Sequence, residues 1–327
     1  MAKADQIKAL IRSHADGDNS RFYAVAIQVA AHAARNGHGK LALELRELVD
    51  RAKQQAATPA DGSRNPTPLA QPRGELAGLL AVQYPKTRLS DMALSDDLIE
   101  RIQRVLLEQR QRERIRHHGF APLRKLLLVG PPGTGKTMTA SALAGELGLP
   151  LFTIQLDGLI TKYMGETAAK LRLVFDAIQA TRGVYLFDEF DALGGHRTSN
   201  NDVGEIRRVL NSFLQFLEID TSDSLVIGAT NHAKLLDSAL FRRFDAVIEY
   251  ALPSGNIAAN IMRDRLALLD LTDVDWTAAK HAAEGLSHGE ITRACEQAAK
   301  DAILRESTGV CGAELVAALK QRRAAHS

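Results

Sequence analysis

Residues 130–137 read Gly-Pro-Pro-Gly-Thr-Gly-Lys-Thr, a complete match to the phosphate-binding pattern G-x-x-x-x-G-K-[ST], and we call them the P-loop. The apolar run 126–129 stands directly before this octet, and the helix-forming stretch 138–147 stands directly after it. Only glycine lets a backbone turn tightly enough to bring several N–H groups around one phosphate. The octet and its flanks therefore predict a strand, a turn and a helix that together bind a nucleotide.

Each part of the P-loop has an expected role in binding ATP with Mg²⁺. Lys136 is expected to reach the β- and γ-phosphates as a point charge, and Thr137 to hold Mg²⁺ through its hydroxyl. The N-terminal end of the helix that follows adds a positive partial charge that favours phosphate. The residues expected to contact the nucleotide are Gly130, Pro131, Pro132, Gly133, Thr134, Gly135, Lys136, Thr137 and Met138.

From about residue 89 helical stretches alternate with short apolar runs, which is typical of a parallel sheet wrapped by helices, as in an α/β P-loop NTPase. Ligands of such sheets bind where the strands end. The expected strands are residues 125–129, 151–155, 184–188, 225–229 and 247–250.

The chain divides into four segments by pattern. Residues 1–53 show helical periodicity three times and predict a small N-terminal helical bundle that binds a substrate or partner. Residues 54–88 are rich in proline and small residues, and predict a flexible linker. We expect residues 89–252 to form the α/β part and residues 253–327 an all-α lid. The helices expected in the lid are residues 257–269, 276–284, 288–305 and 313–322.

Composition narrows the class of protein. The chain has 327 residues, of which 45% are hydrophobic, which suffices for more than one core. Residues 1–19 are charged, and no run approaches the roughly 18 apolar residues of a membrane span, so we expect a cytoplasmic protein. The spacing of Cys295 and Cys311 argues against a disulfide framework or a zinc site.

The charge of the chain gives little reason to expect nucleic acid as an obligatory ligand. The net charge is +2, and residues of the two signs are interspersed. The basic stretch 110–118 is the exception. On a helix its arginines would either face solvent or contact phosphates.

Two acidic residues follow the apolar run that begins at residue 184. Asp188 is placed to bind Mg²⁺, directly or through water, and Glu189 to orient and partly deprotonate the attacking water. Asn231, after the next strand, can hydrogen-bond that water and a γ-phosphate oxygen. Each would be an ordinary turn residue by itself. Their places at strand ends predict that they converge with the P-loop on one nucleotide.

Four motifs together resemble those of the AAA family of ATPases: residues 130–137, 187–193, 229–231 and 237–245. The resemblance covers roughly residues 89–306. It implies ATP hydrolysis by a ring, usually a hexamer, in which each ATP lies between subunits. It also implies that Arg242 and Arg243 complete the neighbour's site, where a guanidinium stabilises charge on the transferring phosphoryl group.

The two arginines depart from the family pattern, in which a Pro-Gly or similar dipeptide usually separates them. Arg242 and Arg243 are adjacent, so which of them touches phosphate stays open. The alternative is that one of them pairs with Asp245 or Glu249.

Residues 159–167 resemble the first pore loop of the protein-remodelling branch, which includes katanin, spastin and the ESCRT-disassembly ATPases. The resemblance implies that Tyr163 projects into the channel of the ring and grips an extended polypeptide, with Lys162 and Met164 beside it. Such an aromatic side chain grips without reading sequence. The alternative is that Tyr163 packs beneath the loop.

The lid carries one further signature. Residues 287–290 form the capping box S-x-x-E and match the family's Ser-Gly-Ala-Asp-Leu, with His288 in place of glycine. The resemblance implies a lid over the adenine and ribose. Whether His288 touches the nucleotide or only begins the helix stays open. Residues 91–94 stand where the family has Asp-x-x-Gly for the adenine, and that pattern is absent.

We therefore expect an ATP-dependent oligomeric motor that unfolds, threads or remodels protein substrates. The sequence contains no H-E-x-x-H, so any proteolysis would need a separate peptidase, such as a serine peptidase. The alternative is an ATP-switched, DNA-associated regulator or loader, to which residues 110–118 would contribute phosphate contacts. A head-to-tail interface permits a closed ring or an open spiral.

Overall fold

The computed structural model describes residues 72, 74–159, 164–189, 202–232 and 241–325, which belong to one compact unit, Thr67–Ser327. The side chains of residues 164–165 and 202–208 lie outside this description. The bundle predicted for residues 1–53 also lies outside it. Within the described ranges no helix is long and apolar enough to cross a membrane.

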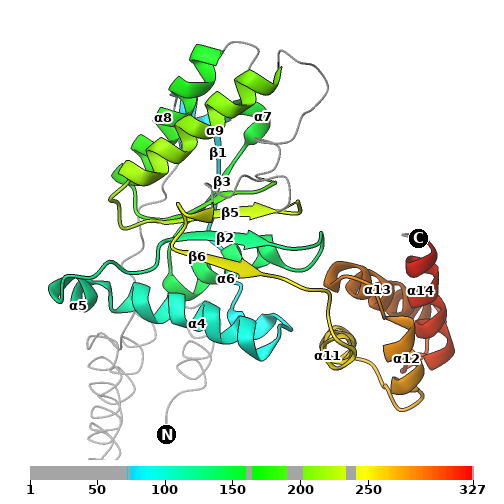
Figure 1. The fold of residues 1–327 in the computed structure, drawn as a ribbon. Coiled ribbons are helices and arrows are strands. Elements are labelled where there is room, and N and C mark those ends of the chain that lie inside the picture. The colour runs from blue at the N-terminus through cyan, green and yellow to red at the C-terminus, as the bar shows by residue number, and fades with distance from the viewer. Residues whose placement is uncertain (1–71, 73, 160–163, 190–201, 233–240, 326–327) are drawn as a thin grey trace, which may run out of the picture. The chain divides into compact units, whose positions relative to one another are not determined.

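Six strands of the described part form one sheet in the order β1-β3-β4-β5-β2-β6 (Figure 1). Every pairing except that of β1 with β3 is parallel, which confirms the predicted parallel sheet. Each expected strand forms with its ends shifted by at most one residue. These strands are β2 (Lys125–Val129), β3 (Leu151–Ile154), β4 (Val184–Phe187), β5 (Leu225–Thr230) and β6 (Ala246–Glu249).

The segment before residue 89 corrects the predicted linker. A 3-10 helix, η1 (Gly74–Gly78), leads into strand β1 (Leu80–Gln83), which pairs antiparallel with β3. Leu79 and Leu80 are buried in the core of the sheet, and a second 3-10 helix, η2 (Leu89–Asp91), follows. Burial of these leucines stabilises the edge of the sheet, so the α/β part begins near residue 74 and not at 89.

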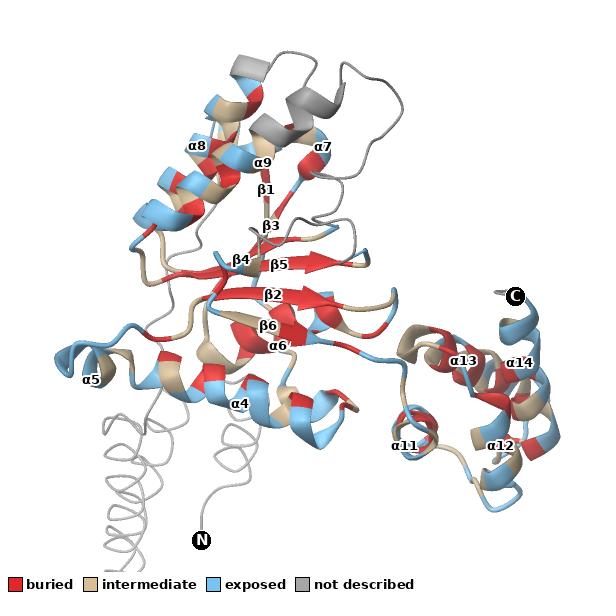
Figure 2. Ribbon diagram, in the orientation of Figure 1, coloured by how far each residue is buried: buried red, intermediate tan, exposed pale blue. Residues whose placement is uncertain are grey.

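Helices cover both faces of the sheet. Successive residues of a strand point to opposite faces, so Leu126 and Leu128 pack on one side while Leu127 and Val129 pack on the other. Figure 2 shows the resulting burial of the central strands. Helices α4 (Asp96–Arg110) and α6 (Lys136–Leu147) cover the first side. Helices α8 (Met164–Ala180) and α9 (Asp202–Ile219) cover the second, and the short α7 (Leu156–Leu159) precedes α8.

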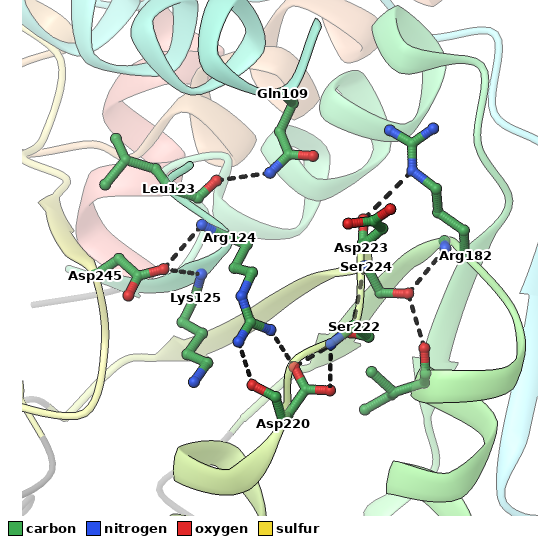
Figure 3. A network of polar contacts seen from close by, with 12 residues as sticks. Gln109, Leu123, Arg124, Lys125, Arg182, Asp220, Ser222, Asp223, Ser224 and Asp245 are labelled. Atoms are coloured by element: carbon green, nitrogen blue, oxygen red, sulfur yellow. Dashed lines mark hydrogen bonds and ion pairs between the residues drawn. The ribbon is translucent and has the colours of Figure 1, made fainter. Parts of the chain in front are cut away.

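A polar network joins the starts of the strands (Figure 3). The buried carboxylate of Asp220 forms an ion pair with the guanidinium of Arg124. The backbone N–H groups of Arg124 and Lys125 both donate to Asp245 at 2.9 Å. On the same network, Arg116 of α5 (Arg112–His117) pairs with Asp223. These contacts fix the loops that enter β2, β5 and β6.

The C-terminal residues form four helices around a core of their own, as predicted. Ser254, Asp275 and Ser287 cap three of them, because each side chain accepts a hydrogen bond from a backbone N–H of the first turn. The Ser254 cap places the start of the first helix two residues before the expected one. The helices are α11 (Gly255–Arg265), α12 (Trp276–Ala282), α13 (His288–Leu304) and α14 (Gly312–Ala325).

Candidate functional site

The P-loop joins the end of β2 to the start of α6 and turns through three glycines with positive φ angles. These angles are 150° at Gly130, 72° at Gly133 and 99° at Gly135. A Cβ atom at Gly130 would collide with the carbonyl oxygen of Tyr250, and one at Gly133 would lie 2.6 Å from the Ser287 hydroxyl oxygen. The positive φ angle favours glycine at all three positions, and at Gly130 the backbone of Tyr250 also leaves no space for a side chain.

The loop is held together by its own side chains. Lys136 is buried, and its Nζ donates to the carbonyl oxygens of Gly130 at 2.8 Å and Pro131 at 2.7 Å. The buried hydroxyl of Thr134 also donates to the Pro131 carbonyl, at 2.8 Å. The ammonium group is thus kept at the loop, while Met138, also predicted to contact the nucleotide, is exposed on the first turn of α6.

The P-loop meets the acidic end of β4 through one hydrogen bond. The Thr137 hydroxyl donates to Oδ2 of Asp188 at 2.8 Å, and Oδ1 of Asp188 accepts the backbone N–H of Glu189 at 3.0 Å. The structure therefore brings together the two residues that the sequence predicts as Mg²⁺ ligands. Their hydroxyl and carboxylate are oxygen donors, the type that Mg²⁺ prefers.

Glu189 has an unusual backbone. Its φ is 50°, in the left-handed region that residues other than glycine rarely adopt. Its side chain is exposed at the end of β4, beside Asp188. Strained backbone of this kind persists where the surrounding structure enforces it, and it is enriched at functional sites.

Asn231 reaches the same edge of the sheet through β5. The register pairs Val129 with Thr230, and the backbone N–H of Gly130 donates to the Thr230 carbonyl at 3.3 Å. Asn231 therefore directly follows a residue that is bonded to the first residue of the P-loop. Its side chain is half-buried. Asp188, Glu189 and Asn231 thus share one end of the sheet with the P-loop.

The two arginines lie at the other end of the strands. In the parallel pairing of β2 with β6, Leu126 stands opposite Ala246 and Val129 opposite Glu249. Arg242 and Arg243 precede β6, so they lie next to the start of β2, away from the P-loop of their own chain. Both are exposed.

One of the two arginines has a partner within its own chain that the sequence did not predict. Arg243 forms an ion pair with Glu218, at the end of α9. Asp245 instead accepts the backbone N–H groups that Figure 3 shows, and within the described residues Glu249 has no ion pair. The alternative of a pairing with Asp245 or Glu249 is therefore not observed for Arg243, whose partner within the chain is Glu218.

The predicted pore loop falls largely outside the described part of the chain. Lys162 and Tyr163 lie outside the described residues, and Met164 begins α8 with a side chain that is also outside them. The basic stretch 110–118 is described. Arg110 forms an ion pair with Glu146 at 3.0 Å, so part of the positive charge of this stretch is neutralised within the chain.

The lid contacts the P-loop directly. The backbone N–H of Gly289 donates to the Gly133 carbonyl at 3.0 Å, and Ser287 caps α13 as the S-x-x-E pattern predicts. A pocket of about 330 Å³ lies between residues 131–133 of the loop and residues 285–293 of the lid. This volume is at the lower end of the range for small-molecule sites, roughly 300–1,000 Å³.

Two site features were missed by sequence reasoning. Tyr250, just after β6, is buried and its hydroxyl lies 2.6 Å from that of Thr139 in α6. Burial raises the pKa of Tyr250 to about 12, and the hydrogen bond to Thr139 opposes this shift. The bond from His288 to the Ala93 carbonyl, at 3.0 Å, was also missed. Neither has a local pattern, because the partners are far apart in sequence.

Within the described residues no group of three or more His, Cys, Asp or Glu side chains is arranged to hold a metal ion. A cation held by Thr137 and Asp188 would therefore take its remaining ligands from elsewhere. Mg²⁺ commonly combines one or two carboxylates with substrate phosphates and water. The donor set at Thr137 and Asp188 fits that mode of binding.

Comparisons with known proteins indicate one protein family for this chain. Residues 126–252 match the family model described as the ATPase family associated with various cellular activities (AAA). The chain is 34% identical to the uncharacterized AAA family ATPase y4kL of Sinorhizobium fredii, over 93% of this chain and 90% of that protein.

Two further relatives match over a shorter share of their length. The proteasome-activating nucleotidase of Methanospirillum hungatei is 32% identical over 76% of this chain, which spans 63% of that protein. A katanin p60 ATPase-containing protein of Danio rerio is 33% identical over 61% of this chain and 43% of its own length. The resemblance to the branch that includes katanin is thereby confirmed.

Proposed function

The chain belongs to the AAA family of ATPases, and on that premise we propose that it hydrolyses ATP at the edge of the sheet where the P-loop meets Asp188 and Glu189. The observation that carries the proposal is the 2.8 Å hydrogen bond between Thr137 and Asp188. It joins the loop that would bind phosphate to the strand that would supply the acidic groups.

The residues present fit a nucleotide with Mg²⁺. Thr137 and Asp188 would hold the cation, which would neutralise charge on the phosphates during their transfer. Lys136 would contribute its ammonium charge, and the N-terminus of α6 its dipole, to binding of the β- and γ-phosphates. The glycines of the P-loop hold an open turn, which would direct backbone N–H groups toward the same phosphates.

Glu189 and Asn231 would activate and orient the attacking water. A carboxylate that is exposed at the strand end, beside Asp188, can accept a proton from a water molecule. Asn231 would orient the same water and a γ-phosphate oxygen through its amide. The backbone strain at Glu189 supports this role, since it is an observed outlier at the predicted position.

A second copy of the chain would complete the site. Because Arg242 lies at the opposite end of β2 from its own P-loop, it can contribute only to the nucleotide of another copy. Such an arginine supplied in trans accelerates phosphoryl transfer by about 10³ to 10⁵ in related systems. Hydrolysis would then require head-to-tail assembly, as a ring or a spiral.

The assembly would act on polypeptides. Tyr163, with Lys162 and Met164, is the proposed grip on the polypeptide. That one relative is a proteasome-activating nucleotidase supports the proposal that the assembly delivers polypeptides to a separate peptidase. An ATP-stimulated cleavage assay with a candidate peptidase tests that step. Cleavage that is unchanged in a Tyr163→Ala variant would exclude the grip.

The first test is the mass of a Glu189→Gln variant with ATP and with ADP. Blocking hydrolysis while retaining ATP should trap the assembled state, so we expect a hexamer or short spiral with ATP alone. The control is Lys136→Ala, which should bind no nucleotide and remain unassembled. A monomer or dimer of Glu189→Gln under both conditions would reject the motor and leave ATP as a binding switch.

A further inference from the structure

Two neighbouring residues at the start of α13 bind two separate segments of the α/β part. His288 bonds through Nε2 to the carbonyl oxygen of Ala93 at 3.0 Å. Gly289 donates its backbone N–H to the Gly133 carbonyl of the P-loop, also at 3.0 Å. Ala93 itself packs against the core of the lid. The start of α13 is therefore the point at which the lid, the P-loop and residues 91–94 meet.

The bond to Ala93 defines the state of the imidazole. A carbonyl oxygen can only accept, so Nε2 of His288 carries the hydrogen and Nδ1 carries a lone pair in the neutral ring. Nδ1 is buried and has no hydrogen-bond partner among the described residues. Burial lowers the pKa of His288, which favours this neutral ring, and the bond to Ala93 partly opposes the shift.

This arrangement is not that of a space-filling residue. An apolar side chain would fill the same position without burying an acceptor that has no partner among the described residues, and such buried polar atoms are rare. What the imidazole adds is a directed bond across the boundary between lid and sheet. The family signature has glycine at this position, which can form no such side-chain bond.

We propose that His288 is a positioning residue, which docks the lid on residues 91–94 and thereby holds Gly289 against the P-loop. This rests on the proposed function only for its consequence, namely that a docked lid slows release of the nucleotide. The pocket of about 330 Å³ between residues 131–133 and the lid is the space whose closure would depend on this bond.

Two substitutions separate the bond from the bulk of the side chain. His288→Leu replaces the imidazole with an apolar side chain of similar size and removes the donor. His288→Gln keeps an N–H donor at nearly the reach of Nε2. His281→Leu is the matched control, because His281 is an exposed histidine of the same lid whose Nδ1 lies 3.3 Å from a carboxylate oxygen of Glu284 in that lid.

The experiment is amide hydrogen exchange on the nucleotide-free protein, followed at Gly289, whose N–H acceptor lies on the P-loop. We expect exchange to be about 5- to 10-fold faster in His288→Leu, near wild type in His288→Gln, and unchanged in His281→Leu. His288→Gly serves as a second donor-free variant if the leucine variant does not fold. The proposal would be overturned if the Gly289 amide exchanged as slowly in the donor-free variant as in wild type. It would also be overturned if His288→Gln failed to restore slow exchange.

The consequence is measured by release of a fluorescent ATP analogue, which should be several-fold faster in His288→Leu than in His288→Gln. The two readouts separate the proposals. If wild type binds no nucleotide, the proposed function fails, while the exchange at Gly289 still decides whether His288 docks the lid. Faster exchange without faster release would remove the consequence and retain the docking.

Discussion

The guanidinium of Arg243 forms an ion pair with Glu218 of the same chain, whereas its neighbour Arg242 has neither an ion pair nor a side-chain hydrogen bond within the described residues. Both arginines are exposed on the turn before β6. A guanidinium that has no partner among the described residues is available to a neighbouring copy of the chain. The contrast therefore favours Arg242 as the residue that acts in trans.

We expect Arg242→Ala to lower ATPase activity by about 10²-fold or more, and Arg243→Ala to lower it less. The unassembled protein should still bind nucleotide in both variants. The decisive measurement mixes Arg242→Ala with Glu189→Gln, each of which is expected to have little activity alone. Mixed assemblies pair an intact P-loop site with an intact arginine, so activity should partly return. Failure of the mixture to regain activity would argue against a contribution in trans.

The bond between Thr137 and Asp188 predicts a defect in metal use. Asp188→Asn keeps the shape of the side chain and removes its charge, so we expect the Mg²⁺ concentration needed for half-maximal hydrolysis to rise by roughly tenfold or more. Titration of activity with Mg²⁺ measures this. Asp157→Asn, on the short helix α7, is the control and should titrate as wild type. An unchanged Mg²⁺ requirement in Asp188→Asn would remove Asp188 from the metal site.

The ion pair of Arg124 with the buried Asp220 predicts a large effect on stability. Asp220→Asn leaves a guanidinium without its charge partner in a largely buried place, so the free energy of unfolding should fall by about 3 to 5 kcal/mol. The comparison is Asp264→Asn, on α11, for which no ion pair occurs within the described residues. Urea unfolding of both variants measures this free energy. If the two variants lost the same amount, the buried pair would contribute little to stability.

Tyr250 predicts a loss of stability at alkaline pH. Its pKa is raised to about 12 in the folded chain from an ordinary value of 10.0, so the folded state holds the phenolic proton more tightly. The stability that this difference in pKa contributes is fully present below pH 10 and is lost as pH rises through the pKa of the folded state. The rise from 10.0 to about 12 corresponds to about 3 kcal/mol.

The measurement is the urea midpoint between about pH 9 and 11.5 for wild type and Tyr250→Phe. The decline should be shallower in the variant because phenylalanine has no proton to lose. It should not vanish, since burial also raises the pKa of Tyr185. If the urea midpoints of the two proteins fell in parallel with pH, Tyr250 would have the same pKa in the folded and unfolded states.

The strands and the lid helices could be predicted from sequence because their signals are local patterns. Leu126 to Val129 is an unbroken apolar run because β2 is buried on both faces, and such a run is visible in sequence. The Ser287 cap is equally local, since its partner N–H belongs to Glu290. The strand β1 was missed because Leu79 to Val82 is a short apolar run beside a proline-rich segment. Its partner is β3, far along the chain.

The sequence alone determined the P-loop octet, the strand ends that carry Asp188 and Asn231, and the helices of the lid. These depend on residue type and spacing within a few turns or strand lengths. Tertiary structure decided the pairing of Arg243 with Glu218, the bond of His288 to Ala93, and the place of Arg242 at the far end of β2. The physical reason is that ion pairs and hydrogen bonds between distant segments depend on how the chain packs, and spacing along the chain carries no record of that packing.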